Sequence, residues 1–348
     1  MTQPEICINV VRPSTEVKIL SKTDNGALIR DLADRGLSAV VTNLDTFSGG
    51  GLAFLPRISG ENVTFEPARV DTSGLKVMYN RMVYPHKRPE VAHIKKLNDN
   101  RLKEYADSKY LLYQELLKAY QVTTEIIHMD TANADEVESV LEVFASTPNI
   151  TVKADKGNGG GSTAHMPLSE LAAYVDVKMK EDKTPNLVVQ PTINFGPLPA
   201  GIRAHSEEDQ ELVDATRSQG LLNEVRMMAV MSGERLTLVP VLRVVVKSGE
   251  VMGDASDRYI DVELPDEMVV KLEAITTEVV RGAAENAGNI QHLVAAVDYY
   301  FDNDGEPFIM EANMRSPAVP RTHTTPKSGR LLHTAIADTM YDMVQQKD

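Results

Sequence analysis

The chain has 348 residues, of which 42% are hydrophobic, 5% are aromatic and none is Trp, and its formal charge is −14. This length allows about two or three domains and a substantial core. The negative charge, without any Lys/Arg-rich block, argues against an open nucleic-acid surface, so an anionic ligand must meet a local basic pocket.

The single cysteine and the N-terminal segment predict the compartment. Cys7 has no partner for an internal disulfide, and without a CxxC pair neither a disulfide framework nor a zinc-thiolate site is indicated. The N-terminus lacks a long apolar segment, and no stretch reaches the roughly 18 apolar residues of a membrane span. We therefore expect a cytoplasmic protein that does not bind a membrane.

The first 100 residues alternate between strand and helix patterns. Residues 5–11 and 37–41 are short apolar runs, and residues 27–32 between them have helical spacing. This order is typical of a parallel α/β unit. Residues 49–51 are three glycines, but the residues after them do not resemble the start of a helix, which disfavours a phosphate loop. A further strand is expected at 76–84.

From residue 98 the sequence becomes charged and helical. The run at 101–120 places its apolar residues near one stripe and contains Lys109, which is either a ligand contact or a solvated surface lysine. A second helix is expected at 135–144 and a strand at 149–153. We place a domain boundary near residue 100.

The strand at 149–153 leads into the glycine-rich sequence GNGGGS at 157–162. This sequence has neither the Walker A spacing nor the last glycine of GxGxxG. Consecutive glycines still let backbone N–H groups approach a polyphosphate, and Lys153 and Lys156 add positive charge at the stem. The alternative is a flexible hairpin tip.

Residues 194–220 lie between two strand patterns. A helix at 169–179 and an apolar strand at 187–190 are expected before them. The segment itself is polar and contains proline and glycine, which predicts an inserted loop or lid rather than core.

Two expected strands each carry an arginine. Arg226 lies in the strand at 223–231 and Arg243 in the strand at 236–246, with a hairpin turn at 232–234 between them. An arginine inside an apolar strand is costly to bury without an anionic partner. Both residues therefore either bind an anion or extend from an edge strand into solvent.

A hairpin at 294–320 follows a long helix at 266–286 and precedes a terminal helix at 331–344. Its Asp304-Gly305 pair favours a two-residue turn, which sets Asp298 directly opposite Glu311 with Asn313 on the same face. A four-residue loop keeps all three on one face, whereas a three-residue loop does not.

The shared face of this hairpin predicts a metal site. Two facing carboxylates repel each other unless a proton or a cation lies between them. Mg²⁺ takes such oxygen ligands, usually together with substrate phosphates. The alternative is an ordinary solvated hairpin face.

These features, in this order, resemble the ATP-grasp superfamily. The sequence DYYFDNDGEPFIMEANMRSP at 298–317 is a strong match to the metal motif of the family, and VKADKGNGGGS at 152–162 is a looser version of its lysine and glycine loop. Ala154 stands where proline is frequent, and Gln190 replaces the acidic residue common at the hinge. The resemblance covers about residues 98–320.

The resemblance implies a fold of α/β and α+β type, namely an ATP-grasp fold preceded by a Rossmann-like α/β domain. The expected units are an N-terminal α/β domain at 1–100, a central ATP-binding lobe with the glycine-rich loop at 101–193, and a C-terminal lobe with the metal site at 194–348. A homodimer is the expectation taken from the family.

The resemblance also implies roles for individual residues. Contacts to the ATP phosphates or to the adenine side would come from Lys109 and Lys153. A mobile loop over the phosphates would be formed by Gly159, Gly160, Gly161 and Ser162. The adenine hinge would be Gln190, Pro191, Thr192 and Ile193. The metal ligands would be Asp298, Glu311 and Asn313. The arginines that bind phosphate or a carboxylate would be Arg226, Arg243 and Arg315.

The implied activity is that of an ATP-dependent carboxylate–amine ligase. It would use Mg²⁺, or Mn²⁺, and would join a small-molecule or peptide carboxylate to an amine through an acyl phosphate, releasing ADP and phosphate. Arg243 is the preferred catalytic clamp for the developing charge. The alternatives are a small-molecule kinase of the same fold and a nucleotide-binding protein that has lost its chemistry. Candidates to line the acceptor pocket are Tyr79, Arg81, Arg321 and His323.

Overall fold

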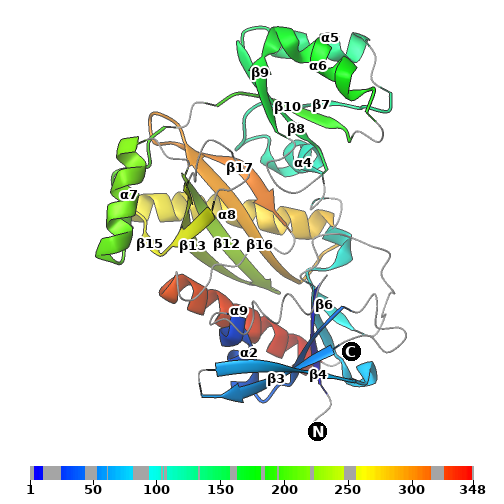
Figure 1. The fold of residues 1–348 in the computed structure, drawn as a ribbon, viewed down its shortest axis with the longest axis vertical. Coiled ribbons are helices and arrows are strands. Elements are labelled where there is room, and N and C mark those ends of the chain that lie inside the picture. Colours follow the sequence, from blue (N-terminus) through cyan, green and yellow to red (C-terminus); the bar gives the residue numbers. More distant parts are fainter. Residues whose placement is uncertain are drawn as a thin grey trace.

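The protein is built from three units, each organised around its own β-sheet (Figure 1). The structure is a computed structural model, and it describes residues 4–10, 25–43, 53–60, 62–80, 94–102, 105, 108–131, 134–156, 163–181, 185–193, 196–219, 223–246, 256–314 and 325–346. Within these ranges, none of the helices combines the length and the apolar character needed to cross a bilayer.

The N-terminal unit contains a six-stranded sheet of order β4-β3-β2-β1-β5-β6. Four of its strands are parallel: β1 (Ile6–Asn9), β2 (Ala39–Thr42), β5 (Val77–Asn80) and β6 (Lys95–Leu97). Helix α2 (Asn25–Asp34) connects β1 to β2, so the predicted strand–helix–strand order is confirmed.

An antiparallel hairpin extends one edge of this sheet. It consists of β3 (Ala53–Ser59) and β4 (Asn62–Ala68), and β3 pairs with β2. The three glycines at 49–51 lie outside the described residues. Because a strand begins at Ala53, the absence of a helix after these glycines is confirmed.

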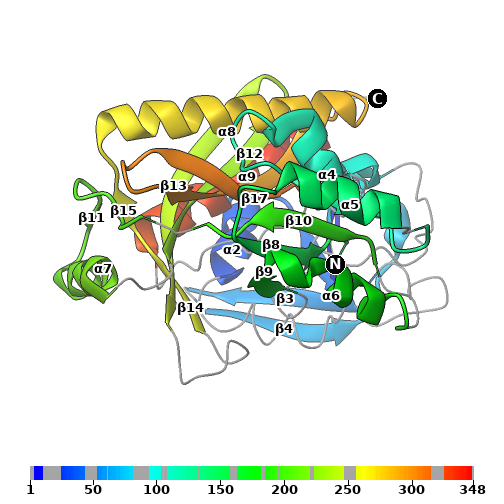
Figure 2. The same cartoon turned by 90° about the horizontal axis from the view of Figure 1, so that it is seen from above.

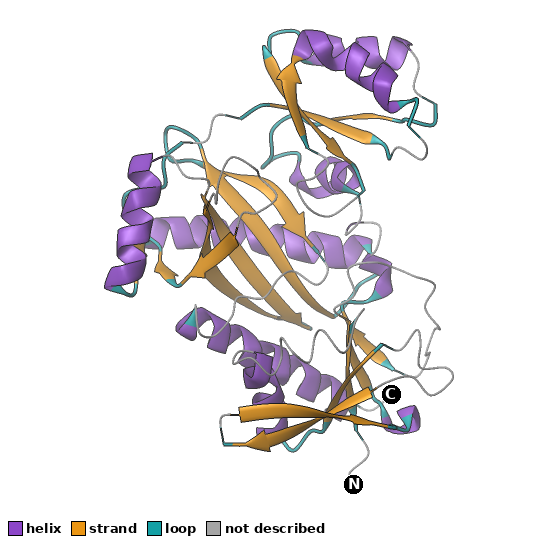
Figure 3. Cartoon of the chain, viewed as in Figure 1, coloured by secondary structure: helices purple, strands orange, loops and turns teal. Residues whose placement is uncertain are grey.

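The central unit is a four-stranded antiparallel sheet of order β7-β10-β8-β9 with two helices on one face. The strands are β7 (Glu125–Ile127), β8 (Asn149–Ala154), β9 (Ala164–Pro167) and β10 (Leu187–Pro191). The helices α5 (Ala134–Val143) and α6 (Leu171–Lys178) form the outer layer, and the other side of the sheet is turned toward the large sheet (Figures 1 and 3). Every helix and strand expected from 135 to 190 is found there.

The helix that carries Lys109 is shorter than expected. A 3₁₀ turn spans Asn100–Leu102, and the α-helix α4 is only Lys109–Leu112, continued by a π-helical turn over Tyr113–Leu117. Ser108 caps the N-terminus, because its side chain accepts a hydrogen bond from the backbone N–H of Leu111 at 3.1 Å. The interpretation of Lys109 as a residue inside a long helix is therefore wrong, since Lys109 is the first helical residue.

The C-terminal unit is a five-stranded sheet of order β14-β13-β12-β16-β17 between two long helices. Its strands are β12 (Asn223–Ser232), β13 (Arg235–Val246), β14 (Ser256–Ile260), β16 (His292–Phe301) and β17 (Pro307–Asn313). Helix α8 (Asp266–Asn286) covers one face, and helix α9 (Pro326–Gln345) packs against the other (Figure 2). The expected bounds of the 266–286 helix are confirmed, whereas the terminal helix begins five residues earlier than expected.

Helix α9 joins the C-terminal sheet to the N-terminal unit. Its buried residues Leu332, Ile336 and Met340 share one hydrophobic cluster with α2 and with β12 and β13. Polar contacts add to this packing, because Arg35 pairs with Asp338 at 2.6 Å. The first 100 residues are thus anchored to the end of the chain.

Within the 194–220 segment, the described residues 196–219 contain regular structure, which corrects the expectation of a loop. It contains the two-residue strand β11 (Arg203–Ala204), which pairs with β15 (Val262–Glu263), and the 13-residue helix α7 (Glu207–Gln219). The helix is stable because Val213 is fully buried against the core of the large sheet. Whether this segment covers a substrate stays a hypothesis.

Candidate active site on the five-stranded sheet

The hairpin of β16 and β17 has a three-residue turn followed by a compensating bulge. Asp302 N–H donates to the Glu306 carbonyl at 3.0 Å, which leaves residues 303–305 as the turn, and Gly305 has a φ of 82°. Phe301 pairs with Pro307 and Tyr299 with Ile309, but Asp298 pairs with Glu311. The expected two-residue or four-residue loop is therefore wrong.

Met310 is the extra residue that restores the predicted face. It lies at the register shift beside the Asp298–Tyr299 step, so two residues of β17 oppose one of β16. The bulge cancels the displacement that a three-residue turn causes. Asp298 opposite Glu311 is therefore confirmed, and Asn313 donates from Nδ2 to Asp298 Oδ2 at 3.2 Å.

Polar residues occupy the part of this sheet face that α9 does not cover. On β12, Met228 and Val230 belong to the cluster that includes α9, and the period of two places Arg226 and Glu224 next on the same face. On β16, Val294 and Ala296 likewise give way to Asp298 and Tyr300. On β13, Val239 and Val241 give way to Arg243.

Arg226 and Asp298 form a buried bidentate ion pair. They lie directly opposite each other on the central strands β12 and β16, and their exposed fractions are 5% and 1%. Arg226 donates from Nε to Oδ1 at 2.6 Å and from Nη2 to Oδ2 at 2.7 Å. The alternative that Arg226 extends from an edge strand into solvent is thus wrong. Burial alone would lower its pKa, but the Asp298 carboxylate raises it above its ordinary value.

Glu224 is a buried carboxylate that the sequence analysis missed. Its Oε1 accepts from Arg243 Nη1 at 2.6 Å and from Arg226 Nη2 at 3.4 Å, and its Oε2 accepts from the Tyr300 hydroxyl at 3.3 Å. The Tyr259 hydroxyl lies 2.7 Å from Arg226 Nη1. A signal was present in the sequence, because Glu224 precedes Arg226 by two residues in a strand and so shares its face.

The environment of Glu224 favours its protonated form. Burial and, to a lesser extent, the charge of Asp298 raise the pKa of Glu224 from 4.5 to about 7, and Arg226 and Arg243 oppose this rise. The folded chain thus keeps a proton that the unfolded chain releases above pH 4.5. The folded state consequently loses stability as the pH rises from about 4.5 to about 7, and no further above that.

Replacing Glu224 with Gln is expected to remove this pH dependence. Relative to the Glu224→Gln variant, the wild type should have a smaller free energy of unfolding at pH 8 than at pH 5, measured by urea denaturation. The matched control is Glu234→Gln, since the Glu234 side chain is 97% exposed. If the difference in free energy of unfolding between the wild type and Glu224→Gln is the same at both pH values, the pKa of Glu224 is not raised in the folded state.

Glu311 and Lys153 approach each other from opposite lobes. The Glu311 side chain is exposed and makes no hydrogen bond to another residue in the described ranges. Lys153 on β8 lies 4.0 Å from the Met310 sulfur through its Nζ. Burial lowers the pKa of Lys153 to about 8. The charge of Glu311 opposes this decrease, and the charge of Lys109 adds to it. The bulge therefore lies between a lysine of the central sheet and a carboxylate of the large sheet.

Lys109 lies at the stem of the glycine-rich segment. Its Nζ donates to the carbonyls of Ala154 and Asp155 at 3.1 and 3.3 Å. Asp155 in turn accepts from Ser108 Oγ and Tyr110 N–H, which holds the start of α4 against β8. The two predicted lysines are thus brought together at the end of one strand.

The predicted hinge follows the central strand β10. Gln190 is buried, and its Nε2 donates to Thr124 Oγ1 at 2.8 Å. Pro191 ends the strand, and the Thr192 N–H donates to the Asn149 carbonyl at 2.9 Å. The Gln190 side chain is thus engaged within the protein, and Thr192 Oγ1 lies 3.2 Å from Thr151 Oγ1.

Several predicted residues lie outside the described residues. These are Gly159, Gly160, Gly161, Ser162 and Arg315, together with the pocket candidates Arg81, Arg321 and His323. Tyr79 is described and is buried in β5.

The oxygen atoms of Asp298, Glu311 and Asn313 suit a hard divalent cation. Glu311 is exposed, and Asn313 keeps Oδ1 for a ligand because its Nδ2 donates to Asp298. Only two of the three residues are acidic, and no group of three or more His, Cys, Asp or Glu side chains in the described part of the chain forms a metal centre. The set fits Mg²⁺ completed by oxygens from a substrate phosphate better than a closed protein cage.

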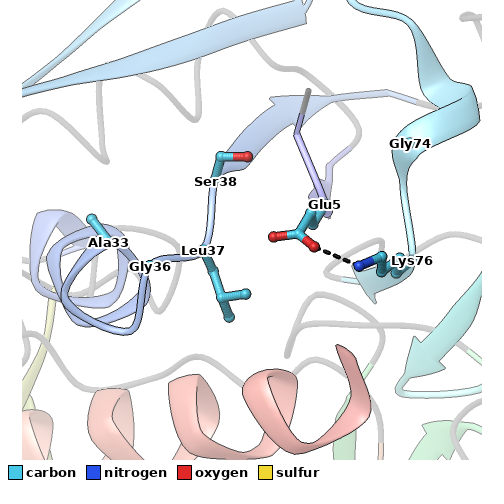
Figure 4. Close-up of a pocket in the computed structure, with 7 residues that line it drawn as sticks. All are labelled: Glu5, Ala33, Gly36, Leu37, Ser38, Gly74 and Lys76. Carbon is cyan, nitrogen blue, oxygen red and sulfur yellow. Dashed lines mark hydrogen bonds and ion pairs between the residues drawn. The ribbon is translucent and has the colours of Figure 1, made fainter. Parts of the chain in front are cut away.

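A pocket of about 530 Å³ lies elsewhere, at the amino-terminal ends of the parallel strands (Figure 4). Its polar groups Glu5 and Lys76 pair with each other at 2.6 Å. Ligands of open α/β sheets bind at the carboxyl ends of the strands, so this pocket is not a candidate active site.

Solved structures share the fold of the whole chain. D-alanyl-alanine synthetase A from Vibrio cholerae superposes with a TM-score of 0.59 at 12% identity, over 99% of this chain and 98% of that one. The VanG D-Ala:D-Ser ligase from Enterococcus faecalis gives a TM-score of 0.61 at 11% identity over 99% and 100%. The ATP-grasp ligase PsnB, complexed with a minimal precursor, gives 0.55 at 13% over 98% and 100%.

Comparison by sequence finds no related family or protein. Neither a protein-family profile nor a curated protein sequence matches the chain. At 11–13% identity the likeness to solved structures shows the fold alone. The predicted fold class is confirmed, because the ATP-grasp ligase PsnB superposes over 98% of this chain and 100% of its own.

Proposed function

From the ATP-grasp fold, we propose that this protein is an ATP-dependent ligase that joins a carboxylate to an amine through an acyl phosphate. The substrates would be a small-molecule or peptide carboxylate and an amine acceptor. One observation carries the proposal: Arg243, Arg226, Asp298 and Glu311 share one sheet face, and Lys153 approaches it from the facing lobe.

This charge arrangement suits a reaction between two anions. A carboxylate that attacks a phosphoryl group meets like charge, so cationic groups must neutralise the oxygens and align the attack. The Arg243 side chain is 25% exposed and donates from Nη1 to Glu224, so a cationic group lies at the partly accessible side of this sheet face, where it would attract an anion. Each nitrogen of the Arg226 guanidinium group bonds to a residue of the protein. Arg226 would therefore stabilise the sheet face on which the other residues of the site lie.

Mg²⁺ would be held by Asp298, Glu311 and Asn313. When bound, the ion neutralises the charge on phosphate oxygens and helps to orient them. Lys153 would contact the phosphates from the other lobe, and its lowered pKa of about 8 still leaves it mainly protonated at neutral pH. The Met310 sulfur lies 4.0 Å from Lys153 Nζ, so its side chain would provide apolar contact beside this lysine.

The proposed reaction has two steps. A carboxylate oxygen attacks the γ-phosphorus of ATP, the bond to the β,γ-bridging oxygen breaks, and ADP leaves. Arg243 donates hydrogen bonds to the phosphoryl oxygens as charge develops on them. An amine then attacks the acyl carbon, phosphate departs, and the amide nitrogen releases its proton to solvent.

A trapping assay tests the proposed function. The purified protein is incubated with ATP, Mg²⁺ and a panel of carboxylates, with and without amines, and ADP, phosphate and the hydroxamate formed with hydroxylamine are measured. Hydroxamate formation that depends on a carboxylate supports the ligase. A phosphorylated alcohol without hydroxamate would instead identify a kinase, and no ADP with any substrate would identify a binding protein.

A further inference from the structure

We infer that Glu224 is a positioning residue that fixes Arg243 for the transferred phosphoryl group and holds Arg226 in place beside it. This inference rests on the proposed function and deepens it. The observation behind it is that both oxygens of one buried carboxylate are engaged by the two arginines and a tyrosine of the same sheet face.

The contacts of Glu224 hold Arg243 in one orientation. Glu224 and Arg243 are directly opposite each other on β12 and β13, and the 2.6 Å hydrogen bond to Nη1 fixes one edge of the guanidinium. The Tyr300 hydroxyl donates to the second oxygen at 3.3 Å. The carboxylate is thus itself held on both sides.

Arg226 has two carboxylates within reach. Asp298 takes two of its nitrogens, and Glu224 lies 3.4 Å from Nη2. Because Asp298 is also a proposed metal ligand, its negative charge would be shared with the cation. Glu224 would then be the carboxylate that retains Arg226 in place, since it takes no part in the metal set.

A purely structural role does not account for this placement. A buried carboxylate disfavours folding unless its partners compensate, and here burial and Asp298 together outweigh the two arginines. A hydrophobic residue at the same position would avoid this unfavourable term. A residue that lowers stability while it orients two cations next to an open carboxylate is typical of a functional site.

The test compares binding of Mg²⁺·AMPPNP and Mg²⁺·ADP to the full chain by isothermal titration calorimetry at pH 8. We expect the wild type to bind AMPPNP more tightly, because only that nucleotide presents a γ-phosphoryl group to Arg243. Both Glu224→Gln and Glu224→Asp should reduce the ratio of the two affinities by about tenfold, as the loss of a hydrogen bond to a charged group does.

The two variants separate positioning from charge. Gln keeps the length of the side chain and removes its charge, whereas Asp keeps the charge and withdraws the oxygens from Arg243. Since Asp also provides a second variant, an unfolded Glu224→Gln protein does not prevent the test. Glu234→Gln, in the exposed turn between β12 and β13, should bind both nucleotides as the wild type does.

A double-mutant cycle shows whether Glu224 acts through Arg243. Arg243→Ala should lower the affinity ratio, and adding Glu224→Gln to it should lower the ratio no further. Additive effects, or an unchanged ratio in both Glu224 variants, would overturn the inference. Equal affinities of the wild type for the two nucleotides would also overturn it while leaving the proposed function in place. If the wild type binds neither nucleotide, both fail.

Discussion

Replacement of Glu311 with Gln is expected to lower ATP turnover by about two to three orders of magnitude. Glu311 is the exposed carboxylate opposite Asp298, and it is a proposed metal ligand. A bound metal contributes several kcal/mol to the stabilisation of charge in phosphoryl transfer, and a neutral amide is a weaker ligand. The measurement is ADP release with the carboxylate and amine identified by the trapping assay.

The fold of the Glu311→Gln variant should be unchanged. The side chain is exposed and makes no hydrogen bond within the described ranges, so the free energy of unfolding should move by less than about 0.5 kcal/mol. Glu306→Gln is the matched control, because Glu306 lies beside the same hairpin and pairs with Lys271 on α8. Wild-type turnover in Glu311→Gln would refute the metal assignment.

Replacement of Arg226 with Met is expected to destabilise the protein by about 3–5 kcal/mol. Arg226 is the bidentate partner of Asp298, and both side chains are nearly inaccessible to solvent. Removing one partner of a buried ion pair leaves the other charge without compensation in a low dielectric. The Tyr259 hydroxyl and Glu224 lose a contact as well. Urea denaturation at pH 7 measures the change.

Two further variants test the cause of that loss. Arg226→Met combined with Asp298→Asn removes both charges and should recover a large part of the stability, as expected for coupled neighbours. Arg235→Met on the adjacent strand removes an exposed pair with Asp342 and should change the stability by about 1 kcal/mol or less. A loss in Arg226→Met no greater than in Arg235→Met would contradict a buried ion pair.

The β16–β17 hairpin shows how a correct prediction can follow from an incorrect step. The two-residue turn was inferred from Asp304-Gly305, and Gly305 does adopt the left-handed conformation. The actual turn has three residues, and the bulge at Met310 restores the pairing of Asp298 with Glu311. Bulges depend on how a strand fits its neighbours, and here the Ile309 N–H of β17 also donates to the Tyr120 carbonyl, three residues after the π-helical turn.

The two errors in helix assignment are explained by contacts with distant parts of the chain. Around Lys109, charged residues with helical spacing predict one long helix, but Ser108 caps a new helix start and donates to Asp155, which directly follows β8. In the 194–220 segment, proline and glycine at its start hid a 13-residue helix whose stability depends on Val213 packing against the distant sheet. Neither contact can be read from neighbouring residues.

The sequence by itself determined the strands that carry the site and the faces of those strands. Period-two alternation placed Arg226, Asp298, Glu311 and Asn313 on defined sides of their strands, because successive side chains in a strand point to opposite faces. Tertiary structure alone decided which of these side chains meet. The pairing of Arg226 with Asp298 joins strands 72 residues apart, and that of Glu224 with Arg243 depends on the register of a hairpin. Register and lobe packing are set by the burial of many residues together, which no single motif encodes.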